Sequence, residues 1–91
     1  MANTASAKKR IRSSERKRIR NQLHRSRART QLRRAKQLIA EGELVAAQEA
    51  VQSALGSLDR AVARGVIHKN SAARRKARLM RRLRRAQEEA G

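Results

Sequence analysis

Residues 44–62 read LVAAQEAVQSALGSLDRAV, and apolar side chains recur there at intervals of three and four positions. The residues in this pattern are Leu44, Ala47, Val51, Ala54, Leu55, Leu58 and Val62. Such spacing gathers side chains on one face of an α-helix, because a helical turn takes about 3.6 residues. No strand-like alternation of β-branched residues occurs anywhere in the chain. The sequence therefore predicts an all-α fold with this helix at its centre.

Glycines mark the ends of this helix and of the one before it. Gly42 and Gly65 each follow a helix-favouring segment and suit the C′ position, where glycine takes the left-handed conformation at little cost. Asn70 is predicted to cap the next helix. The expected helices cover about residues 7–41, 44–64 and 71–89. Gly56 lies inside the second helix and should destabilise it by about 1 kcal/mol relative to alanine. A close approach of another helix at this position would explain why glycine is present.

The two outer helices also carry apolar faces, but the face of the first changes along its length. In the last helix the row is Ala72, Leu79, Leu83 and Ala86, flanked by Ala73, Ala77 and Met80. In the first it is Ala28, Leu32, Ala35, Leu38 and Ile39. At 100° per residue, Ile11, Ile19 and Leu23 point to nearly the opposite side. We therefore expect a three-helix bundle in which the long basic first helix packs only after about residue 28 and extends beyond the bundle.

The net charge also differs between the segments of the chain that form the three expected helices. The 91 residues carry a formal net charge of +18, from 25 Lys and Arg against seven Asp and Glu. Residues 1–40 have a net charge of +13, residues 41–64 of −2 and residues 65–91 of +7. Self-repulsion on this scale favours a polyanionic partner, which could be nucleic acid, an anionic membrane surface or an acidic protein. With few large apolar residues and no Phe, Tyr or Trp, we expect a marginal fold that the partner completes.

Several classes of function find no support in the composition. The absence of cysteine excludes disulfides and thiolate metal sites, and no apolar run is long enough for a membrane span. The basic N-terminus precedes more charge and does not resemble a signal peptide. His24 and His68 are too few for a zinc site, and no acid/base pair or phosphate loop is present. We expect a cytosolic protein that is not an enzyme and has no metal and no cofactor.

The basic residues form two groups. The first comprises the tracts KKRIR (8–12), RKRIR (16–20) and RSRAR (25–29), which surround a helix with positive charge and suit an element enclosed by phosphates. The second, residues 68–76, spans the predicted start of the last helix, where free backbone N–H groups bind anions. A solvated charged surface, with ordinary helix capping, is the alternative interpretation of both groups.

Among the possible partners, the composition favours folded RNA first. Duplex DNA, bound by a DNA-compacting protein, comes second, and a membrane surface comes third. Modules that stack single-stranded bases need aromatic side chains, which are absent. No recognition helix of the helix-turn-helix kind can be located, and residues 7–27 lack the coherent apolar face of a membrane-surface helix. Residues 1–27 are expected to be disordered without RNA. The predicted RNA-binding residues are Lys8, Lys9, Arg10, Arg12, Arg16, Lys17, Arg18, Arg20, Asn21, Arg25, Arg27, Arg29, His68, Lys69, Asn70, Arg74, Arg75, Lys76 and Arg78.

Two sets of residues resemble a known family. The first is MAN (1–3) and SAKKR (6–10), with Arg18, Asn21, Ser26, Arg29 and Thr30; the second, more specific, is GVIHKN (65–70), AAR (72–74) and KARL (76–79). Both resemble bacterial small-subunit ribosomal protein twenty. Ser71, where that family usually has Lys, and Thr4 and Ala5, which replace an apolar-basic pair, depart from it, as does the absence of aromatics in the first helix.

The resemblance implies a three-helix bundle, a single domain over residues 1–91, that binds 16S ribosomal RNA early in assembly, low in the body of the small subunit. It implies RNA contacts by the matching basic residues, Lys8, Lys9, Arg10, Arg18, Arg29, Lys69, Arg74, Lys76 and Arg78. We expect 16S ribosomal RNA as the partner, few or no protein contacts, no membrane and no homo-oligomer. The expected location is the cytoplasmic ribosome.

Overall fold

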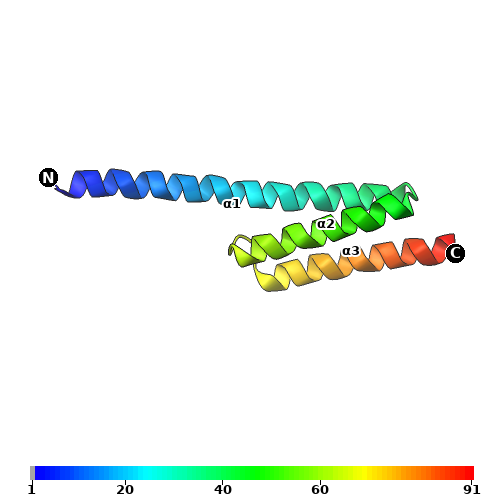
Figure 1. Ribbon diagram of the computed structural model, residues 1–91. Helices are drawn as coiled ribbons and strands as arrows, with labels where there is room; N and C mark the ends of the chain where they lie inside the picture. The colour runs from blue at the N-terminus through cyan, green and yellow to red at the C-terminus, as the bar shows by residue number, and fades with distance from the viewer. Residues whose placement is uncertain (1) are drawn as a thin grey trace.

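The computed structural model consists of three α-helices joined by two short turns (Figure 1). Helix α1 spans Ala2–Ala40, α2 spans Leu44–Ala63 and α3 spans Lys69–Ala90. The structure describes residues 2–91, with side chains from residue 4 onward. Met1, where the predicted extension and the family resemblance begin, and the side chains of the next two residues lie outside the described part. Residues 2–91 contain no strand, which confirms the predicted all-α class.

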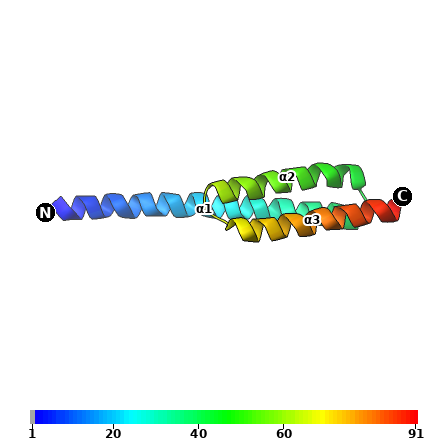
Figure 2. The ribbon, with the colours of Figure 1, turned by 90° about the horizontal axis from the view of Figure 1, so that it is seen from below.

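The helices form an elongated bundle with a projecting arm. Helix α2 runs back along the second half of α1, and α3 returns along α2, so that α1 and α3 run in the same direction (Figures 1 and 2). The molecule measures 71 × 21 × 13 Å, and its radius of gyration is 18.1 Å. A compact domain of this length would have a radius of about 12 Å. The difference comes from the first half of α1, which extends beyond the bundle as predicted.

Both turns use glycine in the left-handed conformation. Gly42 has a φ of 77° and Gly65 a φ of 71°, as their predicted C′ positions require. At the second turn, the Val66 N–H donates to the carbonyl oxygen of Ala61 at 2.9 Å. At the first turn, the Glu43 N–H donates in the same way to the carbonyl oxygen of Leu38 at 3.0 Å. These bonds satisfy carbonyl groups that a helix end leaves without partners. The two glycines therefore fix where α1 and α2 end.

The start of α3 corrects the predicted cap. The N-cap residue is His68, not Asn70, and the helix begins at Lys69. His68 has an extended backbone (φ −68°, ψ 141°), and its Nδ1 accepts a hydrogen bond from the Asn70 N–H at 3.1 Å. The imidazole thus supplies the acceptor that we expected from the Asn70 side chain. Asn70 lies inside the first turn, and α3 starts two residues earlier than predicted.

The core is small and rich in alanine. The buried apolar residues are Ala28, Leu32 and Ala35 of α1; Ala47, Ala50, Val51, Ala54, Leu58 and Ala61 of α2; Val66 of the second turn; and Ala72 and Leu79 of α3. The largest fully buried side chains are Leu58, Leu79 and Val51, each worth about 1.5–3 kcal/mol of burial. Ala50, Ala61 and Val66 lie outside the three predicted stripes, and the other buried apolar residues belong to them. The flanking Ala73, Ala77 and Met80 are exposed.

The apolar residues of the projecting arm stay outside this core. Ile11, Ile19 and Leu23 are 63%, 50% and 50% exposed. Their exposure confirms the prediction from helical phase that they cannot share a core with the later part of α1. The arm is helical in the structure, and its expected disorder without RNA stays a prediction.

Gly56 does not mediate a close helix approach. A Cβ atom built at this position would meet only the guanidinium of Arg60, at 3.5 Å, which is ordinary van der Waals contact. Arg60 lies one turn further along the same helix and donates to the Ser57 hydroxyl at 3.3 Å. The hypothesis that another helix requires glycine here is therefore wrong.

Candidate nucleic-acid interface

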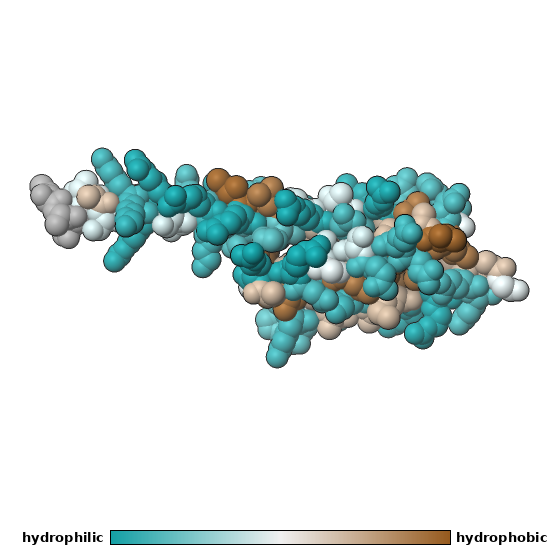
Figure 3. Space-filling view, viewed as in Figure 1, coloured by the Kyte–Doolittle hydropathy of each residue, from teal (hydrophilic) through white to brown (hydrophobic). Residues whose placement is uncertain are grey.

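The projecting half of α1 carries positive charge on all sides. From Thr4 to Arg20 every side chain is exposed, and the hydrophilic side chains radiate from this half in the space-filling view (Figure 3). The predicted RNA-binding residues found here are Lys8, Lys9, Arg10, Arg12, Arg16, Lys17, Arg18 and Arg20. A single straight helix therefore presents them in several directions at once.

This charge is almost unneutralised within the protein. Over the side chains of residues 4–91, the only ion pair joins Lys76 Nζ to Asp59 Oδ1 at 2.8 Å. The pair connects α3 to α2, so Lys76, a predicted RNA contact, is directed toward a carboxylate of its own chain. The remaining basic side chains have no acidic partner among the described residues, which leaves their charge available to a polyanion.

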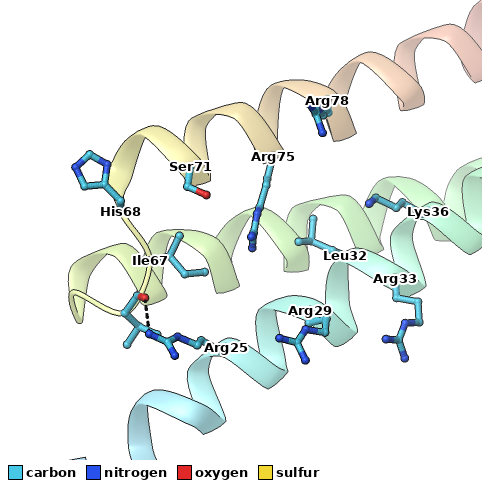
Figure 4. Close-up of a pocket in the computed structure, with 11 residues that line it drawn as sticks. Arg25, Arg29, Leu32, Arg33, Lys36, Ile67, His68, Ser71, Arg75 and Arg78 are labelled. Carbon is cyan, nitrogen blue, oxygen red and sulfur yellow. Dashed lines mark hydrogen bonds between the residues drawn. The ribbon is translucent and has the colours of Figure 1, made fainter. Parts of the chain in front are cut away.

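A groove of about 710 Å³ runs between α1 and α3 (Figure 4). These two helices contact each other less extensively than either contacts α2, which leaves the space between them open. One wall consists of α1 residues spaced four, four and three positions apart, so that they share one helix face. We call this space the α1–α3 groove. Its lining residues are Arg25, Arg29, Leu32, Arg33, Lys36, Val66, Ile67, His68, Ser71, Arg75 and Arg78.

Arg25 lies at the base of the projecting arm and contacts the turn between α2 and α3. Its Nη2 atom donates to the carbonyl oxygen of Val66 at 3.5 Å, a long hydrogen bond drawn in Figure 4. Val66 belongs to the turn between α2 and α3, so this contact links the base of the arm to the start of α3. The arm thus enters the bundle beside one end of the α1–α3 groove.

Two further hollows continue the basic surface along the arm. One, of about 640 Å³, is lined by Ser14, Lys17, Arg18, Asn21, Gln22, Arg25, Ser26 and Arg29. A smaller one, of about 170 Å³, is lined by Lys17, Arg20, Asn21, His24 and Arg64. Arg25 and Arg29 line both the larger hollow and the α1–α3 groove. The basic surface is therefore continuous from the arm to the third helix.

The structure divides the predicted site residues into those that converge and those that do not. The groove brings together Arg25, Arg29, His68, Arg75 and Arg78, which are far apart in sequence. The predicted residues Arg27, Lys69, Asn70 and Arg74 are exposed outside all three hollows.

Two basic residues of the groove were not among the predicted site residues. Arg33 and Lys36 line the groove but lie in the part of α1 that we assigned to packing. Their spacing from Arg29, four and seven positions, was the signal that could have revealed them.

The described residues contain no group of three side chains that could hold a metal ion. None of the three helices, as far as the chain is described, is long and apolar enough to cross a membrane.

Comparison with known proteins identifies the family. The sequence model described as Ribosomal protein S20 matches residues 2–84. The chain belongs to the ribosomal protein S20 family. A relative in Thermomicrobium roseum, "Small ribosomal subunit protein bS20", is 52% identical over 83 residues, covering 91% of this chain and 84% of the relative. Relatives of the same name in Roseiflexus sp. and Mycobacteroides abscessus are 48% and 49% identical, over 94% and 87% of this chain and 93% and 92% of theirs.

Membership of the S20 family confirms the resemblance drawn from residues 1–30 and 65–79. It also confirms that the chain is not an enzyme, since the S20 proteins are ribosomal proteins. The family match covers the projecting arm and all but the last turns of α3. The matched residues therefore include both groups of basic residues.

Proposed function

We propose that this protein is a structural constituent of the bacterial small ribosomal subunit, in the cytoplasm, that binds 16S ribosomal RNA directly. Its S20 relatives are named as proteins of that subunit. The observation that carries the proposal is the continuous, unneutralised basic surface on α1 and α3, with one ion pair among the described side chains against a net charge of +18. Such a surface suits the phosphates of a large folded RNA.

The proposed mechanism is architectural. The arm of α1 inserts between RNA segments, α3 and the groove hold a second site, and α2 sets the spacing between them. Each phosphate neutralised by Lys or Arg releases condensed counterions, which drives binding. Because the same protein neutralises phosphates of separate RNA elements, it lowers their mutual repulsion and helps assemble the body of the subunit.

The proposed RNA contacts are the predicted residues of the arm and those that line the α1–α3 groove. Lys76 lies outside both sets, and its ammonium group is paired with Asp59 at 2.8 Å, so we do not include it among the proposed contacts. We further propose that the protein binds as a monomer and needs few or no protein contacts, because its charged surface favours RNA over a second copy of itself.

Sedimentation of ribosomal particles tests this function. The tagged protein, expressed in a bacterium, should co-sediment with small subunits in equimolar amount with 16S ribosomal RNA and remain there after a salt wash. Recovery with the nucleoid, or equally with all RNA-containing fractions, would contradict the proposal.

A further inference from the structure

The α1–α3 groove places like charges on facing walls. The α1 wall carries Arg25, Arg29, Arg33 and Lys36, and the α3 wall carries Arg75 and Arg78. Figure 4 shows Arg75 reaching from α3 toward α1. No acidic residue lines the groove. Six positively charged side chains therefore line one shared space.

This arrangement opposes the packing of α3 against α1. Other contacts hold α3 in the bundle, chiefly the burial of Ala72 and Leu79 and the ion pair of Lys76 with Asp59 on α2. The contact between α1 and α3 is the least extensive in the bundle. The six charged side chains are exposed to solvent, so the repulsion between them is strongest at low salt, where screening is weak. An anion in the groove would turn this repulsion into attraction.

We infer that the α1–α3 groove holds one sugar-phosphate strand of folded RNA, and that this strand completes the packing of α3 against α1. The inference rests on the proposed function and assigns a partner to this part of the site. From residue 25 to residue 36 the α1 wall is about 16 Å long at 1.5 Å per residue, enough for several consecutive phosphates. Guanidinium groups on both walls suit phosphate oxygens, which they bind in a two-pronged manner.

The shape of the groove favours a single strand. A volume of about 710 Å³ between two neighbouring helices is too small to enclose a double helix of RNA, and the deep, narrow major groove of such a helix does not admit side chains. The chain has no aromatic residue on which a base could stack. The groove therefore binds the sugar-phosphate backbone of the RNA strand, and Leu32, Val66 and Ile67 provide apolar contact for the sugars.

Arg33 and Lys36 allow a matched test. The groove variant is Arg33→Gln/Lys36→Gln, and the control is Arg34→Gln/Arg84→Gln, which removes the same charge from exposed positions outside the groove. Binding of each full-length protein to 16S ribosomal RNA is measured over a range of KCl concentrations. Losing two phosphate contacts should reduce the slope of log K against log salt by about 1.4–1.8 in the groove variant. The control should keep nearly the wild-type slope.

The unfolding temperature gives an independent readout of the packing effect. Without RNA, the groove variant should unfold at a higher temperature than the control, because repulsion between the groove walls is reduced. Adding inorganic tripolyphosphate should raise the unfolding temperature of the wild type and the control more than that of the groove variant. Circular dichroism at low temperature checks that all three proteins are folded.

The outcomes separate this inference from the proposed function. Equal changes of slope in the two variants, with tight binding by the wild type, would overturn the groove assignment and leave the ribosomal function standing. Equal tripolyphosphate shifts in all three proteins would also overturn it. Failure of the wild type to bind 16S ribosomal RNA in preference to other polyanions would overturn the function itself.

Discussion

Gly56 and Gly65 have opposite roles at the scale of single residues. Gly56 lies within α2 with room for a methyl group, whereas Gly65 has a φ of 71°, which favours glycine. We expect Gly56→Ala to stabilise the protein by about 1 kcal/mol, because alanine is the better helix former. Gly65→Ala should destabilise it by about 1–2 kcal/mol, because a side chain is strained in the left-handed conformation.

Urea unfolding of the two variants, followed by circular dichroism, measures both changes. Each variant serves as the other's control, since the substitution is the same. A loss of stability in Gly56→Ala would mean that its Cβ meets a contact not present in this structure.

Some features of single residues could be predicted from the sequence, and others could not. The stripe around Val51 and Leu58 was predictable because helical periodicity is local and burial follows from it. The cap at His68 was not, because it depends on the backbone conformation that orients the ring nitrogen toward the Asn70 N–H. The pairing of Lys76 with Asp59 joins two helices, so no pattern within either helix contains it.

At the scale of elements, the arm of α1 has little to stabilise it in the free protein. Its apolar residues are exposed, and its basic residues repel one another along the helix. We expect residues 1–25 to show random-coil amide chemical shifts without RNA and helical shifts when RNA is bound. Residues 28–40, which pack on α2, should be helical in both states and provide the internal reference. Protected, helical amides in residues 1–25 before RNA is added would contradict this expectation.

The arrangement of elements was only partly predictable. The change of apolar face near residue 28 predicted that α1 would extend beyond the bundle, because one straight helix cannot bury two opposite faces. The α1–α3 groove could not be derived in this way. It depends on α1 and α3 each packing more closely on α2 than on each other, and this brings Arg33 and Lys36 into the same groove as Arg75 and Arg78.

At the scale of the whole molecule, a net charge of +18 with one ion pair among the described side chains makes stability depend on salt. From about 10 mM to about 0.15 M salt, the distance over which exposed charges interact falls from about 30 Å to about 8 Å. We expect the unfolding temperature to rise with KCl over this range. The Arg33→Gln/Lys36→Gln variant should show a smaller rise, since it begins with less repulsion. An unfolding temperature that falls or stays constant would mean that self-repulsion does not limit stability.

We propose that the shape of the protein, and not its charge alone, selects small-subunit ribosomal RNA. The most direct measurement is a competition titration near physiological salt, about 0.15 M, where non-specific electrostatic binding is already weak. The protein is bound to labelled 16S ribosomal RNA and challenged with excess duplex DNA and, separately, with transfer RNA. We predict that the 16S ribosomal RNA stays bound against both competitors. Equal displacement by either one would contradict the claim and favour a DNA-compacting or general polyanion-binding role.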